Sequence, residues 1–200
     1  MFVVTADQRG SRTSEDLVPA ALGAVQRIAG PHLVLAPERT AGDEFQAAVS
    51  GAAAILDIVL HLTRLETWSV GVGIGGIEEP LPANVRAARG SAFLNARDAV
   101  EHAKRASTRV AVVGGADGGD AEALVRLLVE LRDRRTVEGW EVRDILAEGL
   151  SQRDAAARLG ITEGAVSLRV RNAALRVEEA AIPALERLLA RADSGSGPAR

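Results

Sequence analysis

The sequence contains no cysteine. Disulfide bridges and zinc sites built from thiolates are therefore excluded. Histidine is also scarce, and the three that occur, His32, His61 and His102, do not have the spacing of metal ligands. We interpret them as ordinary packed or solvated side chains. The sequence thus predicts no metal site made of sulfur or nitrogen ligands.

Long apolar runs are also missing. No segment reaches the roughly 18 consecutive apolar residues that a membrane-spanning helix needs, and the N-terminus lacks the basic and then apolar pattern of a signal peptide. Hydrophobic residues nevertheless make up 47% of the 200 positions, which is enough for one or two domains with a real core. We expect a cytoplasmic protein that does not bind membranes.

Strand and helix patterns alternate over residues 1–115. The apolar spacing predicts strands at 1–6, 32–36, 45–49, 69–77 and 110–113, and helices at 17–29, 51–66 and 90–105. The resulting order, β-α-β-β-α-β-α-β, is that of a ferredoxin-like palm with an added α-β unit. The predicted fold class of this part is α/β (α+β).

Three glycines alternate along the fourth predicted strand, at Gly71, Gly73 and Gly75. A dinucleotide-binding fingerprint, G-x-G-x-x-G, has two residues before its last glycine and is followed by a helix. Here only one residue separates Gly73 from Gly75, and the chain continues as Ile77-Glu78-Glu79-Pro80, which is not a helical pattern. We therefore reject a Rossmann fold. The glycines are better explained by a helix or a ligand that approaches the sheet closely.

Two acids stand where strands end or turn. Asp7 follows the first strand, and Gly42-Asp43 is typical of a hairpin turn, where the carboxylate of Asp43 can simply bond nearby backbone amides. If the first strand lies beside the hairpin, the two carboxylates meet and repel unless a cation lies between them. A Mg²⁺ or Mn²⁺ site at Asp7 and Asp43 is the alternative to a plain turn.

These segments resemble a known family. The stretches TADQRGSR (5–12) and RTAGDEFQ (39–46) resemble the SatD family and, more remotely, the palm domain of class III nucleotidyl cyclases and GGDEF-type diguanylate cyclases. SVGVGIGGIEEP (69–80) and GSAFLNARDAVEHAK (90–104) are similar to a later strand and helix of that family. The resemblance implies metal binding by Asp7 and Asp43.

The same resemblance implies a nucleotide site. Gly42 matches the hairpin glycine, Arg39 occupies the position of a base-recognising lysine, and Arg97 matches an arginine that stabilises the transition state in cyclases. The cyclase asparagine lies four residues before this arginine, and Phe93 stands at that position here. Asn95 is the nearest amide, but it lies two residues further along the helix, so its side chain points about 200° away from the position of the cyclase asparagine. Nucleotide binding is therefore implied without a catalytic residue.

Beyond residue 118 the pattern becomes purely helical. We predict a helical domain at 120–192, after a flexible polar boundary, and a disordered tail at 193–200. The apolar spacing over 178–191 predicts a helix that could also serve to form a homodimer.

A helix-turn-helix is predicted at 150–171. Ser151 and Asp154 form a variant capping box, Gly160 makes the turn, and Thr162 caps the second helix. The spacing of three valines predicts that they face inward, namely Val166, Val170 and Val177. The segment resembles the helix-turn-helix of sigma-factor region four and of MarR- or LuxR-like regulators.

This part of the chain is locally basic, with five arginines against two acids over 150–177. The helix-turn-helix pattern predicts a major-groove face made of Glu163, Gly164, Ser167, Leu168 and Arg171. Phosphate contacts are predicted for Arg153, Arg169 and Asn172. The plain alternative is a three-helix structural bundle.

The sequence as a whole thus predicts a regulator that binds duplex DNA, with a palm-like domain that senses a nucleotide through a divalent metal. Two alternatives stay open: a metal-dependent nucleotidyl cyclase-like enzyme that uses Asp7 and Asp43, and a scaffold with neither activity.

Overall fold

The computed structural model describes residues 1–11 and 13–194, and they form a mixed α/β protein. Two compact units divide the chain. The sheet unit comprises residues 1–126 together with the described residues from Leu185 onward, and the helical unit comprises Leu127–Ala184. Across the described ranges, no helix is long and apolar enough to cross a membrane.

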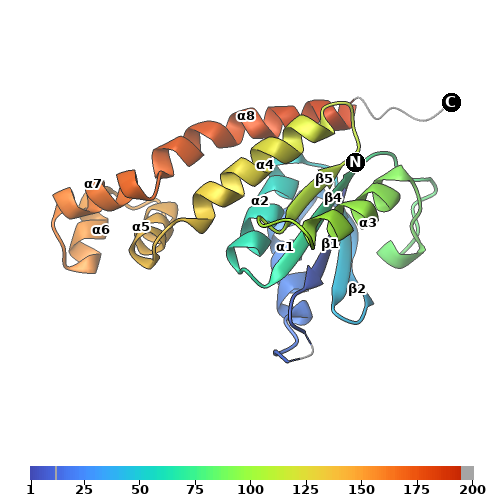
Figure 1. Ribbon diagram of the computed structural model, residues 1–200, viewed down its shortest axis with the longest axis horizontal. Helices are drawn as coiled ribbons and strands as arrows, with labels where there is room; N and C mark the ends of the chain where they lie inside the picture. The colour runs from blue at the N-terminus through green and yellow to red at the C-terminus, as the bar shows by residue number, and fades with distance from the viewer. Residues whose placement is uncertain (12, 195–200) are drawn as a thin grey trace. The chain divides into compact units, whose positions relative to one another are not determined.

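The sheet unit contains a five-stranded mixed sheet (Figure 1). Its strands follow the order β2-β3-β1-β4-β5. All neighbouring pairs are antiparallel except β4 and β5, which are parallel. The element order matches the order expected from the sequence. The strands are β1 (Phe2–Gln8), β2 (Leu33–Ala41), β3 (Glu44–Val49), β4 (Trp68–Ile74) and β5 (Val110–Val113).

Helices cover both faces of this sheet. Helices α1 (Val18–Ala29) and α2 (Ala52–Arg64) lie on one side, and α3 (Ser91–Ala103) lies on the other (Figure 1). Short 3-10 turns occur at Gly30–His32 and Val85–Ala87. The register places Val4 opposite Val72 on the first face and Val3 opposite Gly73 on the second. The three valines are at most 1% exposed, and Gly73 is buried as well. The sheet is therefore buried on both sides.

The alternating glycines of β4 let α3 approach the sheet closely. A Cβ added to Gly73 would lie 2.1 Å from the carbonyl oxygen of Ala92 and 2.2 Å from the amide nitrogen of Ala96, both in α3. Gly71 meets the same helix in the same way, since its Cβ would lie 2.2 Å from the amide nitrogen of Val100. The expected close approach to the β4 glycines is therefore confirmed, and the approaching element is helix α3.

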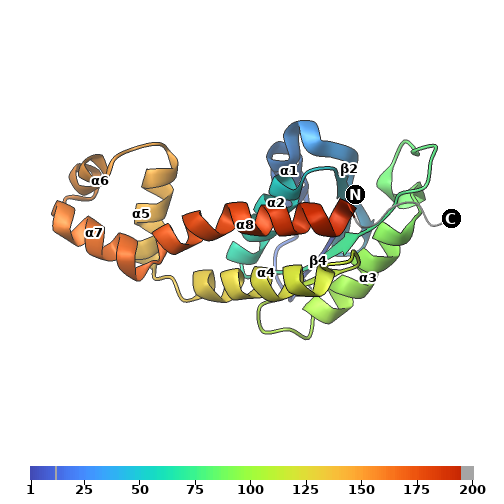
Figure 2. The same cartoon turned by 90° about the horizontal axis from the view of Figure 1, so that it is seen from above.

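The chain after β5 is helical, and the described residues from 114 to 194 contain no strand. Its helices are α4 (Gly118–Asp133), α5 (Val137–Ala147), α6 (Gln152–Leu159), α7 (Glu163–Asn172) and α8 (Leu175–Ser194). Figure 2 shows α5, α6 and α7 gathered together. The compact units do not follow the expected domain limits, 1–115 and 120–192, because the first half of α4 and the end of α8 both belong to the sheet unit.

The end of α8 extends into the segment expected as a tail. Ala192 is fully buried, and the carboxylate of Asp193 accepts a hydrogen bond from the N-terminal ammonium of Met1. These contacts explain why the helix continues to Ser194 instead of ending before 193. Residues 195–200, the rest of the expected tail, lie outside the described residues.

Replacing Gly73 should test the packing of α3. We expect Gly73→Ala to lower the free energy of unfolding by about 1–3 kcal/mol or more, because its methyl group would overlap backbone atoms of α3 that cannot move independently. Gly76→Ala is the control, since its Cβ would meet only the Ser91 hydroxyl at 3.9 Å. Urea unfolding measures both, and equal stabilities would contradict the packing described here.

Candidate functional site

The helical unit contains the predicted pair of helices joined by a tight turn. The hydroxyl of Ser151 accepts a hydrogen bond from the amide of Asp154, whose carboxylate accepts one from the amide of Ser151, and this completes a capping box. Gly160 ends α6 with φ = 65°, a conformation that favours glycine. The Thr162 hydroxyl accepts from the amide of Ala165 at 3.1 Å. The predicted caps and turn are confirmed.

One face of α6 and α7 forms the core of the unit. Val166 and Val170 are buried, as predicted. Val177 is 62% exposed, so its predicted inward position is wrong. The reason is a break at Ala174, which has φ = 53° and separates α7 from α8. Because of this break, the side chains of α8 do not continue the periodicity of α7, and Leu175 instead of Val177 packs into the core.

The opposite face of α7 carries most of the predicted DNA-contacting residues. Every one of them is exposed, and their spacing of three or four places them on one side of the helix. Arg153 is likewise exposed, in the first turn of α6. The structure therefore gathers on α7 the residues Glu163, Gly164, Ser167, Leu168, Arg171 and Asn172.

Arg169 lies apart from this surface. Its side chain is only 27% exposed, and its guanidinium donates to the carboxylate of Glu141 in α5 at 3.1 Å. Together with Asn172 it borders a hollow of about 250 Å³ at the start of α5, beside Thr136 and Glu138. A phosphate contact by Arg169 would require this ion pair to open.

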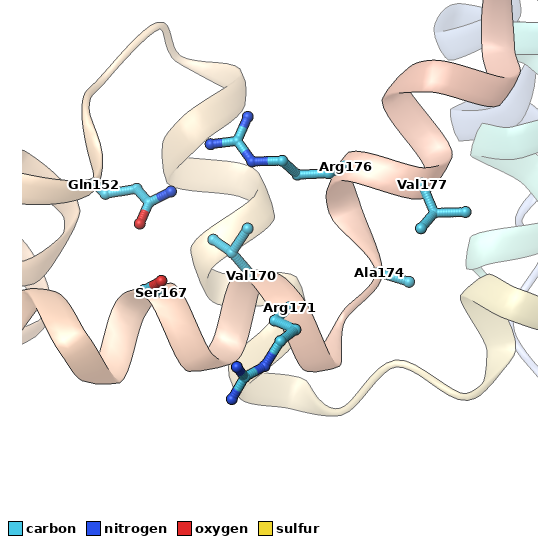
Figure 3. A pocket seen from close by; sticks show the side chains of 7 residues that line it. All are labelled: Gln152, Ser167, Val170, Arg171, Ala174, Arg176 and Val177. Atoms are coloured by element: carbon cyan, nitrogen blue, oxygen red, sulfur yellow. The ribbon is translucent and has the colours of Figure 1, made fainter.

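A second hollow, of about 310 Å³, lies where α6, α7 and α8 meet (Figure 3). We call it the α7–α8 hollow. Two arginines border it, Arg171 from α7 and Arg176 from α8. Arg176 was not predicted as a site residue, because the sequence pattern does not reveal the break at Ala174. The other lining residues are Gln152, Ser167, Val170, Ala174 and Val177.

A buried ion cluster holds the start of α8 in place. The Glu178 carboxylate accepts hydrogen bonds from Arg132 at the end of α4 and from Arg135 just after it. Arg135 also donates to the carbonyl of Ala173 at 3.1 Å. Both guanidinium groups lie over the ring of Trp140, at 5.0 Å and 4.4 Å from its centre. The break at Ala174 is thus fixed from both sides.

The charge of this cluster depends on Glu178. Burial acts to raise the pKa of Glu178, but the hydrogen bond from Arg135 and the charges of both arginines outweigh it and hold the pKa below its ordinary value of 4.5. Burial lowers the pKa of Arg132 despite Glu178. Since a guanidinium stays protonated over the usual pH range, Glu178 is the group that titrates.

In the sheet unit, Asp7 and Asp43 come from adjacent pieces of backbone. The amide of Gln8 donates to the carbonyl of Asp43 at 3.0 Å. Their carboxylates have different partners, because Asp7 pairs with the ammonium of Lys104 at 3.1 Å while Asp43 accepts a hydrogen bond from Ser11. Within the described ranges, no group of three or more His, Asp or Glu is arranged to hold a metal. A Mg²⁺ or Mn²⁺ site stays a prediction.

The predicted nucleotide residues are partly brought together. Arg39, Gly42 and Asp43 border a hollow of about 490 Å³, the hairpin hollow, whose other lining residues are Gln8, Ser11, Ser14 and Asp16. Arg39 donates to the carbonyl of Gly42 at 2.5 Å and forms an ion pair with Asp16. Arg97 is on the exposed side of α3 and does not border this hollow.

Asn95 has a structural contact that explains its position. Its amide donates to the carbonyl of Ile74 at 2.7 Å and so ties α3 to the end of β4.

Comparison with family models, with curated proteins and with solved structures found no match.

Removing the Glu178 carboxylate should destabilise the helical unit. We expect Glu178→Ala to cost about 3–5 kcal/mol, because two buried guanidinium groups would both lose their ion pair with this carboxylate. The control is Glu130→Ala, which removes an exposed partner of Arg134 and should change stability by less than about 1 kcal/mol. Chemical unfolding followed by circular dichroism measures the difference, and equal losses would contradict a stabilising cluster.

The same cluster predicts a pH dependence. Because the pKa of Glu178 is depressed in the folded state, its contribution is present above its ordinary value of 4.5 and is lost as the pH falls through the folded pKa. The stability difference between wild type and Glu178→Gln should therefore shrink below about pH 4.5. A difference that stays constant down to pH 2 would contradict the assignment of the titrating charge to Glu178.

Proposed function

We propose that the helical unit binds duplex DNA, with α7 as the recognition helix in the major groove. The observation that carries the proposal is the capped α6-turn-α7 pair, whose inner face is buried while the outer face of α7 is polar and exposed. Such a pair fits a helix-turn-helix, in which the second helix enters the major groove and the first crosses the backbone.

The exposed residues of α7 have suitable chemistry for base edges. The carboxylate of Glu163 can accept from a cytosine amino group, the hydroxyl of Ser167 can donate or accept, and Leu168 can pack against a thymine methyl group. At Gly164 the absence of a side chain allows the backbone to approach. Phosphate contacts are assigned to Arg153 and Asn172, and to Arg169 once it leaves Glu141.

We further propose that the chain combines a ferredoxin-like palm domain with an all-helical DNA-binding domain and acts as a cytoplasmic transcription regulator. The strand order β2-β3-β1-β4 supports the palm, with β5 as the added strand. The resemblance to the SatD family and assembly into a homodimer belong to the same proposal.

A charge placed on the outer face of α7 should prevent DNA binding. We expect Leu168→Asp to weaken binding to a duplex from the protein's own promoter by about tenfold or more, because a base contact is worth roughly 1–3 kcal/mol and the new carboxylate repels phosphates. Leu124→Asp on α4 is a matched control, since the two leucines are 45% and 46% exposed. Fluorescence anisotropy at low salt measures both, and equal affinities would rule out α7 as the recognition helix.

A second candidate function concerns the sheet unit. The hairpin hollow brings Arg39, Gly42 and Asp43 together, which supports binding of a nucleotide there. Asp7 does not border this hollow, and we propose that it joins Asp43 in holding Mg²⁺ or Mn²⁺ beside the phosphates. For the metal to bind, Asp7 must exchange Lys104 for the cation. We propose that this nucleotide acts as the signal that changes DNA affinity, for which coupling of about 1–3 kcal/mol is typical.

Thermal-shift measurements test the sensor. A nucleotide present with Mg²⁺ at about 100 times its dissociation constant should add roughly 2.7 kcal/mol of stability. Asp43→Asn should lose this gain, since it removes a carboxylate that would hold the metal. If no nucleotide stabilises the wild type, or if Asp43→Asn gains as much, the sheet unit is a scaffold. Incubation with ATP or GTP and Mn²⁺ followed by product analysis identifies the remaining alternative, a nucleotidyl cyclase-like enzyme.

A further inference from the structure

The α7–α8 hollow is bordered by charged groups on two sides and by apolar side chains between them. Figure 3 shows the guanidinium groups of Arg171 and Arg176 on opposite sides of Val170, with Gln152 and Ser167 next to it at the α6 end. Ala174 and Val177 complete the apolar part of the lining. A ligand that fits must carry anionic groups flanking a less polar portion.

The two arginines are available to such a ligand. Over residues 1–11 and 13–194, the side chain of Arg171 has neither an ion pair nor a hydrogen bond, and it is exposed. Arg176 is 75% exposed, and its nearest carboxylate, Glu179, is 4.0 Å away at the limit of an ion pair. Neither arginine is therefore held by the fold, in contrast to Arg169 and Arg158, which pair with Glu141 and Glu148.

The break at Ala174 makes this arrangement possible. In a continuous helix, residues five positions apart point about 140° away from each other, so Arg171 and Arg176 would not border one hollow. The left-handed conformation of Ala174 costs about 1–2 kcal/mol for a residue other than glycine. The buried cluster around Glu178 fixes the first turn of α8 and maintains this conformation.

We propose that a segment of DNA sugar-phosphate backbone crosses the α7–α8 hollow. Arg171 and Arg176 each bind one phosphate, Gln152 donates a hydrogen bond from α6, and the exposed Val177 packs against deoxyribose. The inference rests on the proposed DNA binding and refines it: Arg171 binds the backbone and does not read a base edge, and Arg176 joins the interface.

Salt titrations distinguish the two roles of an arginine. Phosphate contacts release counterions, so losing one should reduce the slope of log affinity against log salt by about 0.9 and weaken binding equally for every sequence. A lost base contact instead reduces discrimination between sequences. The duplexes to compare are one from the protein's own promoter and a scrambled one of the same length, measured by fluorescence anisotropy with the full chain.

The variants are Arg171→Ala, Arg176→Ala, the double variant, and Arg134→Ala as the control. Arg134 lies directly after α4 in the same unit and has a 76% exposed side chain, which matches the 75% of Arg176. We expect each single change in the hollow to lower the affinity for both duplexes by the same factor. Each should also reduce the slope of log affinity against log salt by about one, and the double variant should reduce it by about two. Arg134→Ala should bind like the wild type.

Two results would overturn the inference while leaving DNA binding intact. If Arg171→Ala weakens binding only to the promoter duplex, Arg171 reads a base. If Arg176→Ala binds as Arg134→Ala does, the backbone does not cross this hollow. Failure of the wild type to bind either duplex would overturn the proposed function itself, and with it the inference.

Discussion

The geometry of the helical unit depends on one buried carboxylate. Glu178 joins the end of α4 to the first turn of α8 through Arg132 and Arg135, and Arg135 also bonds the carbonyl of Ala173. A buried ion cluster tolerates little change, because removing one partner leaves charge without compensation in a medium of low polarity. This constraint stabilises the strained backbone at Ala174, and the break in turn decides which side chains lie beside α7.

The sheet unit depends on a steric constraint of a different kind. Gly71 and Gly73 let the backbone of α3 approach β4 to distances that no side chain would permit. With α3 on one face and α1 and α2 on the other, the sheet is buried on both sides, and the open polar positions are left at the end of β1 and at the β2–β3 hairpin. The hairpin hollow lies there. Packing thus leaves this end of the sheet open, while α3 covers the adjoining face.

The two candidate sites differ in how far their residues were predictable. On α7, helical spacing alone placed Ser167 and Leu168 on the exposed face, because a short capped helix has a regular period. The pairing of Arg169 with Glu141 could not be predicted, since the two residues are 28 positions apart and meet only when α5 packs on α7. In the sheet unit, the expected position of the first strand beside the hairpin suggested that Asp7 and Asp43 approach each other. It did not reveal that Asp7 forms an ion pair with Lys104.

The sequence by itself determined the order of strands and helices, the close approach at the β4 glycines, and the caps at Ser151, Gly160 and Thr162. These features follow from local preferences and from periodicity, which act between residues a few positions apart. Only the tertiary structure decided the break at Ala174, the exposure of Val177 and the shared hollow of Arg171 and Arg176. Alanine has no local preference for a left-handed conformation, so the break depends on distant partners of Glu178, and no pattern of neighbouring residues encodes them.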